Sequence, residues 1–247
     1  MGLLDGSVAL ITGAGSGMAK ASVRAFVREG AKVVAADISG AETDTARECG
    51  EGVLPIHCDV TREEDVAGAV DAAVDQFGRL NVVLNVAGIG IGSPLESTDM
   101  ASYDQVLDVN LRGVLHGMKH GTRAMLAGGH GGSIVNWSSV GGLGGSAYTA
   151  IYNASKHGVV GLTKCGAVEL GPRQIRVNAI CLGFILTEIM GAAGAASRPD
   201  MFTKATLGRA GEAHEVAEVA VFLASDRASF VSGAIIPVDG GWSASLA

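Results

Sequence analysis

Tyr152 and Lys156 lie four residues apart in a stretch of helical periodicity. Residues at i and i+4 of a helix share one face, one turn apart. A free phenol has a pKa near about 10, too high for an efficient base at neutral pH. A cation within about 4–6 Å favours the phenolate and lowers that pKa. The spacing therefore predicts that Lys156, with an oxidised nicotinamide as a second cation, makes Tyr152 a usable acid and base beside the cofactor. Lys156 can also donate to the nicotinamide ribose hydroxyls, so both residues are expected cofactor contacts. Tyr148 has no lysine four residues later.

Three further polar residues can assist this pair. Ser138 and Ser139 end an apolar run, where a hydroxyl can hydrogen-bond a substrate oxygen and steady its developing charge. The residues alone do not separate the two serines. Asn110 lies within a helical stretch, although asparagine is a mediocre helix former. Its amide can bind a water that links Lys156 to bulk solvent, or it can be a plain polar helix residue.

A glycine-rich turn, TGAGSGMA at 12–19, follows the first apolar run and precedes a helical stretch. Glycine lets a backbone approach a pyrophosphate closely, and a helix N-terminus offers free N–H groups and positive potential. Such a turn is a weak signal by itself, but its place after the first strand of an alternating chain favours a dinucleotide site. Gly13, Ser16, Gly17 and Met18 are its predicted cofactor contacts.

Asp37 ends the second apolar run, 18 residues beyond Ala19. A carboxylate there can accept hydrogen bonds from the hydroxyls of the adenosine ribose, and it repels a 2′-phosphate. No Arg or Lys occurs at 13–19 or 38–40 to bind such a phosphate. The sequence therefore predicts NAD rather than NADP as the cofactor.

Polar and small residues also follow the next two apolar runs, where the strand ends of a doubly wound sheet line a ligand crevice. Asp59 can contact the adenine amino group and is followed by Val60. Asn85 and Gly88 can shape the edge of the adenosine pocket. Ordinary turn roles stay open for all four.

The elements that position these residues alternate between short apolar runs and longer helical stretches. Runs that are apolar at successive positions are typical of parallel strands covered on both faces. We predict one α/β domain over 1–247, a doubly wound Rossmann-type parallel sheet of about seven strands with helices on both faces. The strands are expected at 8–12, 32–37, 53–57, 81–85, 133–138, 175–181 and 234–238, and the helices at 17–29, 41–49, 63–77, 99–127, 150–170 and 213–224.

Residues 187–211 are small and weakly periodic, with the run GAAGAA at 191–196. A long irregular stretch in a compact α/β domain is often a lid over a ligand, and we predict one here.

Composition excludes several other classes. The net charge is −7 and no Lys/Arg cluster occurs, which disfavours nucleic acid as a partner. No apolar run approaches the roughly 20 residues of a membrane helix, and residues 1–7 lack a signal-peptide pattern, so we expect a cytoplasmic protein. The four cysteines match neither a zinc site nor a redox pair, and no histidine is spaced with them or with carboxylates for a metal.

Together, the order and spacing of these motifs resemble the short-chain dehydrogenase/reductase family, in its compact single-domain branch. The resemblance runs from Val8 to about Trp242. It rests on TGAGSGMA at 12–19, Asp59-Val60, NVAG at 85–88, Asn110, Ser139, YNASK at 152–156, Asn178 with Gly183, and VDGG at 238–241.

The resemblance implies an NAD(P)-dependent oxidoreductase, usually a tetramer, with Ser139, Tyr152, Lys156 and Asn110 as its catalytic group. The family spacing thus favours Ser139 over Ser138. Two positions depart from the family pattern: Ala19 replaces its third glycine, and Leu182 stands where a proline is usual.

The same resemblance extends to the segment that contacts the nicotinamide carboxamide. It implies cofactor contacts at Gly183, Ile185 and Thr187, and Thr187 can also cap a helix. The helix at 152–170 is apolar on more than one face, which favours a homo-oligomer, a dimer or a tetramer.

The expected reaction moves a hydride between NAD(H) and a neutral secondary alcohol or ketone of cyclic, bulky or steroid-like shape. Its pocket is predicted from 89–95, 140–148, 183–184 and the lid, and no cationic anchor occurs in the first three. The alternatives are an NADPH-dependent 3-ketoacyl-carrier reductase and a non-catalytic NAD-sensing protein.

Overall fold

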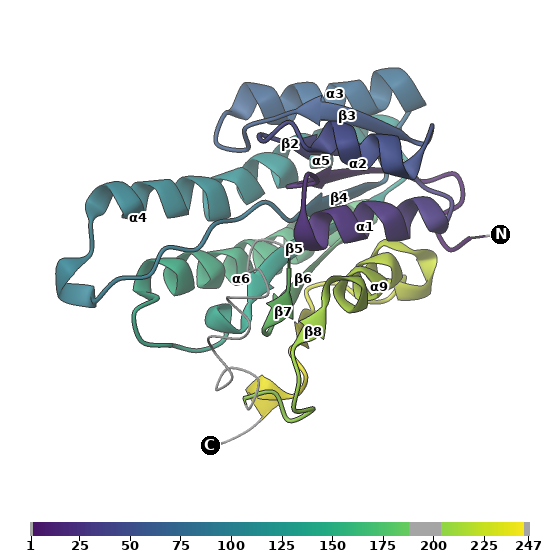
Figure 1. The fold of residues 1–247 in the computed structure, drawn as a ribbon. Helices are drawn as coiled ribbons and strands as arrows, with labels where there is room; N and C mark the ends of the chain where they lie inside the picture. The colour runs from purple at the N-terminus through teal and green to yellow at the C-terminus, as the bar shows by residue number, and fades with distance from the viewer. Residues whose placement is uncertain (1, 188–203, 245–247) are drawn as a thin grey trace.

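The computed structural model describes residues 2–187 and 204–244 and has a seven-stranded parallel sheet at its centre (Figure 1). The strand order is β3-β2-β1-β4-β5-β6-β9, which confirms the predicted doubly wound fold. Every predicted strand is present within one residue of its expected bounds. The strands are β1 (Val8–Thr12), β2 (Lys32–Asp37), β3 (Val53–His57), β4 (Val82–Asn85), β5 (Gly132–Ser139), β6 (Ile175–Leu182) and β9 (Ile235–Val238).

Helices cover both faces of the sheet, and α1 and α9 lie side by side on one of them (Figure 1). Adjacent residues of β1 point to opposite faces: Ala9 and Ile11 pack with the α1 and α9 side, and Val8 and Leu10 with α3, α5 and α6. The helices are α1 (Gly17–Arg28), α2 (Glu42–Cys49), α3 (Glu63–Phe77), α4 (Met100–Leu107), α5 (Gly113–Gly128), α6 (Ala150–Leu170) and α9 (Ala213–Ala224).

The predicted helix at 99–127 has an internal irregularity. A π-helical segment, Asp108–Arg112, joins α4 to α5, and Asn110 is its central residue. Single π turns inside helices are frequent at functional sites. The periodicity of the sequence predicted the continuous helix but not this widened turn.

The predicted lid falls mostly on residues 188–203, outside the described residues. On either side of that gap, β7 (Ile185–Leu186) pairs in parallel with β8 (Gly211–Glu212). Both ends of the segment are therefore fixed at one place beside the carboxyl end of β6.

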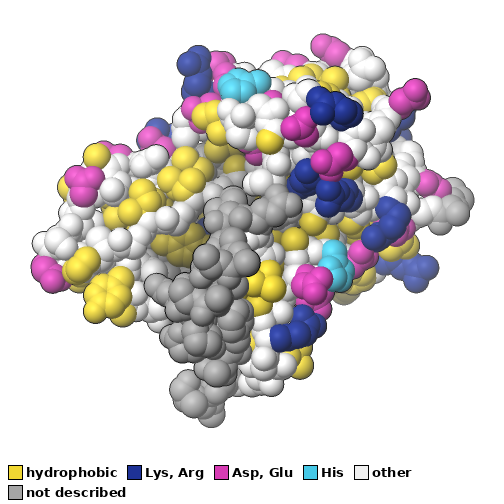
Figure 2. Space-filling view, in the orientation of Figure 1, with side chains coloured by type: hydrophobic (Ala, Val, Ile, Leu, Met, Phe, Trp, Pro, Cys, Tyr) yellow, Lys and Arg dark blue, Asp and Glu magenta, His cyan; other side chains and the backbone are white. Residues whose placement is uncertain are grey.

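The strand order reverses between β1 and β4, which are neighbours in the sheet although β2 and β3 lie between them in the chain. Connections leave to opposite sides at such a point, and ligands bind in the crevice at the carboxyl ends of the strands. On the face drawn in Figure 2, basic and acidic side chains are interspersed and form no single basic patch. None of the described helices is long and apolar enough to cross a membrane.

Candidate active site

A cleft of about 520 Å³ opens at the switch point between β1 and β4. Most of the predicted cofactor contacts line it, from the ends of the four strands β1 to β4 and from the start of α1. Its predicted lining residues are Gly13, Ser16, Gly17, Met18, Asp37, Asp59, Val60, Gly88 and Thr187.

The glycine turn brings bare backbone to this cleft. Gly13 has φ +74° and Gly17 has φ +52°, the left-handed region that favours glycine. A Cβ on Gly13 would lie 3.0 Å from the Cα of Ala87, so the two strand ends nearly touch. Ser16 caps α1 without a side-chain hydrogen bond, and the first turn of α1 carries no acidic residue. These features fit a pyrophosphate at the N-terminus of α1.

Asp37 is oriented by two main-chain amides. Its Oδ2 accepts from Gly15 N at 2.9 Å and its Oδ1 from Ser39 N at 2.8 Å. The carboxylate is therefore held at the lip of the cleft, beside the glycine turn. Among the described residues that line the cleft, none is Lys or Arg.

Asn85 does not line the cleft. Its Nδ2 donates to Asn136 Oδ1 at 2.8 Å inside the sheet, and Asn136 in turn reaches Thr163 of α6 at 3.0 Å. The expected role at the adenosine pocket edge is therefore wrong in this geometry, and Asn85 joins β4, β5 and α6 instead. Asp59 does line the cleft, with its Oδ1 accepting from the amide and hydroxyl of Thr61.

Tyr152 and Lys156 lie on α6 beside the end of β5. The Lys156 ammonium is 5.7 Å from the centre of the Tyr152 ring, within the predicted range. Lys156 is buried, and its Nζ donates to the main-chain oxygen of Trp137 at 2.9 Å. Gly88 of the cofactor cleft lies close to this ammonium, because a Cβ built there would lie 3.4 Å from Lys156 Nζ.

Burial dominates the titration of both groups. The pKa of Tyr152 is raised above its usual value by burial, and the nearby Ser139 hydroxyl opposes that rise. Burial lowers the pKa of Lys156 to about 8. In the chain without cofactor the phenol pKa is therefore raised rather than lowered, because desolvation is the largest influence on it. The second expected cation, the oxidised nicotinamide, is not part of this structure.

The geometry separates the two serines that the residues left ambiguous. Ser139 lies close enough to the Tyr152 phenol for its hydroxyl to lower the phenol pKa, and its Oγ accepts from Gly141 N at 3.0 Å. Ser138 points instead to α6, where its Oγ donates to the main-chain oxygen of Lys156 at 3.0 Å. Only Ser139 lines the same pocket as Tyr152.

Asn110 is fully buried and its amide group is bonded to protein. Its Nδ2 donates to Ile89 O at 2.8 Å and to Ser155 Oγ at 3.1 Å, and its Oδ1 accepts from Ile89 N at 2.8 Å. Both amide hydrogens are thus used. In this structure Asn110 fixes the loop after β4 against α6, and its N–H groups do not hold the predicted relay water.

A second cavity of about 660 Å³ begins at Ser139 and Tyr152. Gly183 lines it as predicted, whereas Ile185 is buried behind it. Of the predicted substrate segments, 140–148 and 183–184 contribute to its wall and 89–95 does not. None of its described lining residues is charged. They are Ser139, Val140, Gly141, Leu143, Gly144, Gly145, Ser146, Thr149, Tyr152, Asn153, Gly183, Phe184, Ile235, Pro237, Trp242 and Ser243.

A comparison with protein-family models matches residues 13–243 to the family described as enoyl-(acyl carrier protein) reductase. A solved structure of a short-chain type dehydrogenase/reductase from Mycobacterium marinum superposes with a TM-score of 0.92 at 34% identity, covering 98% of this chain and 97% of that one. The chain belongs to the short-chain dehydrogenase/reductase family. It is therefore an oxidoreductase whose family uses a nicotinamide cofactor.

Curated members of the family match over nearly the full chain. An A-factor type gamma-butyrolactone 1′-reductase of Streptomyces virginiae is 44% identical, covering 98% of this chain and 97% of that protein. A 3-oxoacyl-(acyl carrier protein) reductase of Thermotoga maritima is 41% identical, with 96% and 98% covered. A 3-alpha-(or 20-beta)-hydroxysteroid dehydrogenase of Mycobacterium tuberculosis is 42% identical, with 100% and 93% covered.

The sequence did not single out the C-terminal wall of the substrate cavity as a site. Pro237, Trp242 and Ser243 line the cavity from β9 and the turn after it. Asp239 holds that turn by accepting from the amides of Gly241 and Ser243 at 2.9 and 2.8 Å. The VDGG motif that forms this turn can be seen in the sequence. Its position near Tyr152 cannot, because the fold creates it.

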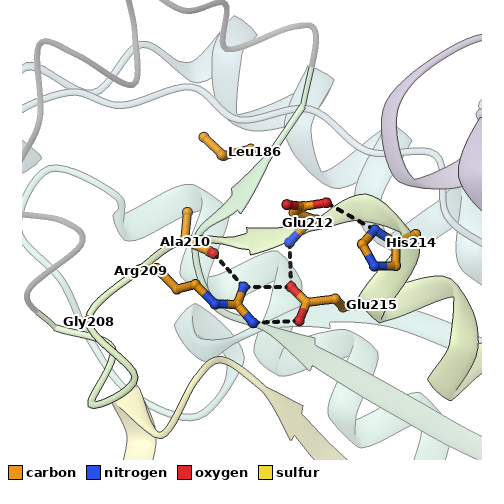
Figure 3. A pocket seen from close by; sticks show the side chains of 7 residues that line it. All are labelled: Leu186, Gly208, Arg209, Ala210, Glu212, His214 and Glu215. Atoms are coloured by element: carbon orange, nitrogen blue, oxygen red, sulfur yellow. Dashed lines mark hydrogen bonds and ion pairs between the residues drawn. The ribbon is translucent and has the colours of Figure 1, made fainter.

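A third cavity, drawn in Figure 3, contains none of the predicted reacting residues. The Arg209 guanidinium donates two hydrogen bonds, one to each carboxylate oxygen of Glu215. His214 lies 3.1 Å from the carboxylate of Glu212. These groups pair with one another at the start of α9.

In the part of the chain that the structure describes, no group of three His, Cys, Asp or Glu residues is placed to hold a metal ion.

The buried ammonium predicts a pH-dependent stability difference between the wild type and Lys156→Met. With a folded pKa of about 8 and an unfolded pKa near about 10.4, the unfolded chain binds the extra proton between these pH values. Stability of the wild type should therefore rise relative to Lys156→Met from pH 7 to pH 10, by about 1–3 kcal/mol. Urea unfolding of both proteins at each pH measures it.

Lys164→Met on the exposed side of the same helix is the matched control. Its difference from the wild type should stay flat over this range. A flat or falling difference for Lys156→Met would show that the ammonium carries no burial penalty.

Proposed function

We propose that this family member is an NAD-dependent dehydrogenase or reductase for a neutral secondary alcohol or ketone. One observation carries the proposal. Ser139 and Tyr152 line the same uncharged cavity, with Lys156 beside Tyr152 and Gly88 of the cofactor cleft close to its ammonium.

The cofactor cleft fits a dinucleotide in shape and charge. The bare glycine turn and the unblocked start of α1 would receive the pyrophosphate, and Asp37 would accept the ribose hydroxyls. Gly183 and Thr187 would flank the nicotinamide, and Ile185 would support that segment from behind. When bound, the nicotinamide supplies the hydride acceptor or donor.

The residues of the chain then handle the proton. In alcohol oxidation, Tyr152 takes the proton of the substrate hydroxyl while Ser139 hydrogen-bonds the same oxygen and fixes its direction. Lys156 stabilises the phenolate and passes the proton toward solvent. Asn110 holds the loop at Ile89 in place beside Lys156 through two hydrogen bonds to the Ile89 main chain. Ketone reduction uses the same groups in reverse.

The substrate cavity favours a neutral, bulky molecule. Leu143, Phe184 and Trp242 give it apolar walls, and the described lining offers no charge to a carboxylate or a phosphate. Two relatives carry names that include a lactone or a steroid, consistent with a cyclic substrate.

A 3-ketoacyl-carrier reductase dependent on NADPH is the second candidate, favoured by the Thermotoga maritima relative. Against it stand Asp37 at the ribose position and the lack of a basic residue in the described cleft lining. A third candidate, a non-catalytic NAD-sensing protein, is disfavoured because Tyr152, Lys156 and Ser139 are all present and assembled.

The chain is further proposed to be a homo-oligomer, a dimer or a tetramer, that works in the cytoplasm. On α6, Val168 is 80% exposed and Cys165 lies on the exposed surface beside it, so an apolar face is uncovered. Sedimentation at micromolar concentration should give at least twice the mass of the 24.9 kDa chain. A single monomeric species would contradict this part of the proposal.

Tyr152→Phe tests the proton transfer directly. The variant should lose about 10²–10⁴-fold in kcat with NAD and a panel of cyclic secondary alcohols, because the phenol that takes the substrate proton is gone. NADH binding, followed by fluorescence, should change less than about twofold. Tyr103→Phe on α4 is the control and should keep full activity. If Tyr152→Phe kept most of its rate, the assignment would be wrong.

Asp37→Asn tests the cofactor. The ratio of kcat/KM for NAD over NADP should fall by about 10–100-fold, because a charged acceptor for the ribose is lost and a repulsion with the 2′-phosphate is removed. Asp44→Asn, which removes an exposed carboxylate from α2, should leave the ratio unchanged. A wild-type protein that prefers NADP would contradict the NAD assignment.

A further inference from the structure

Two hydrogen bonds join the end of β5 to Lys156. The ammonium donates to the main-chain oxygen of Trp137 at 2.9 Å, and the hydroxyl of Ser138 donates to the main-chain oxygen of Lys156 at 3.0 Å. All three residues are buried. The strand therefore binds both the head group and the backbone of this one residue.

The Ser138 bond is not needed to satisfy the oxygen that accepts it. Residue 156 lies inside α6, so its carbonyl belongs to the hydrogen-bond ladder of the helix. A second donor to that carbonyl instead fixes how closely β5 packs against α6 at this point. It does so one residue before Ser139, which lies close to the Tyr152 phenol.

Other elements close tightly around the same hydroxyl. A Cβ on Gly142, in the turn after β5, would lie 2.8 Å from the Lys156 main-chain oxygen and still closer to Ser138 Oγ. Cys181 on β6 lies close enough to Ser138 for the serine hydroxyl to lower the pKa of its thiol, which burial raises. The turn, the helix and both strands thus meet at Ser138 Oγ, which leaves the hydroxyl little room to turn.

We infer that Ser138 is a positioning residue that fixes Lys156 relative to Tyr152. The inference rests on the proposed function, since it assigns Ser138 a role through Lys156. The attraction between an ammonium and a phenolate falls with distance, so a small displacement of α6 at residue 156 changes how well the phenolate is stabilised. Precise support by neighbouring residues is what keeps such a pair in productive geometry.

The chain offers a matched control on the same strand. Ser133 is buried like Ser138, and its Oγ donates to a helix carbonyl, Leu223 O on α9, at 2.9 Å. Ser133→Ala removes a bond from the same strand to a helix carbonyl far along β5 from Tyr152. That carbonyl lies at the C-terminal end of α9 and also accepts from Arg176 Nη1 at 2.7 Å. Ser138→Cys keeps nearly the same shape with a weaker donor, and Ser138→Ala removes the donor.

Three readouts separate positioning from a general loss of stability: the melting temperature, the NADH dissociation constant, and the pH profile of kcat/KM for alcohol oxidation. Ser133→Ala and Ser138→Ala should lower the melting temperature alike, by about 2–6 °C. Only Ser138→Ala should weaken NADH binding, by about threefold or more. It should also shift the acidic limb of the profile upward by about half to one pH unit, with Ser138→Cys in between.

At pH 7 the shift corresponds to a rate about 3–10-fold lower, and the deficit should close once the pH is above the acidic limb of both proteins, because the phenolate is then formed in each. An unchanged profile and unchanged NADH binding in Ser138→Ala, with activity equal to that of Ser133→Ala, would overturn the inference while leaving the proposed function intact. A wild type that neither binds NADH nor oxidises any alcohol would overturn the proposed function instead.

Discussion

The site depends on burying a phenol and an ammonium together against the end of β5. Taking each group out of water opposes its charged form, which raises the pKa of Tyr152 and lowers that of Lys156 to about 8. The phenol is therefore not a ready base in the chain by itself. The proposed chemistry therefore needs a further positive charge beside the pair, and an oxidised nicotinamide in the adjacent cleft would supply one.

The fold brings the cofactor and the pair together through its strand order. Because β1 and β4 are neighbours, the glycine turn and Gly88 meet at one edge of the sheet. The next two strands, β5 and β6, place Ser139 and Gly183 along the same edge. The cofactor cleft and the uncharged substrate cavity are thus adjacent because successive parallel strands end side by side.

Local signals in the sequence predicted most of this arrangement. The apolar runs matched the strands because both faces of a parallel sheet are covered, and the i and i+4 spacing placed Lys156 near Tyr152. The errors involve tertiary packing. The Asn85 side chain points into the sheet because Asn136 offers it a buried partner. The Asn110 amide hydrogen-bonds the main chain of Ile89. The pKa direction of Tyr152 was missed because burial cannot be read from spacing.

Titration of the Tyr152 phenol with and without NAD⁺ tests the central claim most directly. The protein can be labelled with ¹³C-tyrosine and followed by NMR, with Tyr152→Phe used to assign the signal. The phenol should titrate above its usual pKa in the free chain and at a clearly lower pH once NAD⁺ is bound. The same pKa in both states, or a phenolate already present at neutral pH in the free chain, would contradict the account.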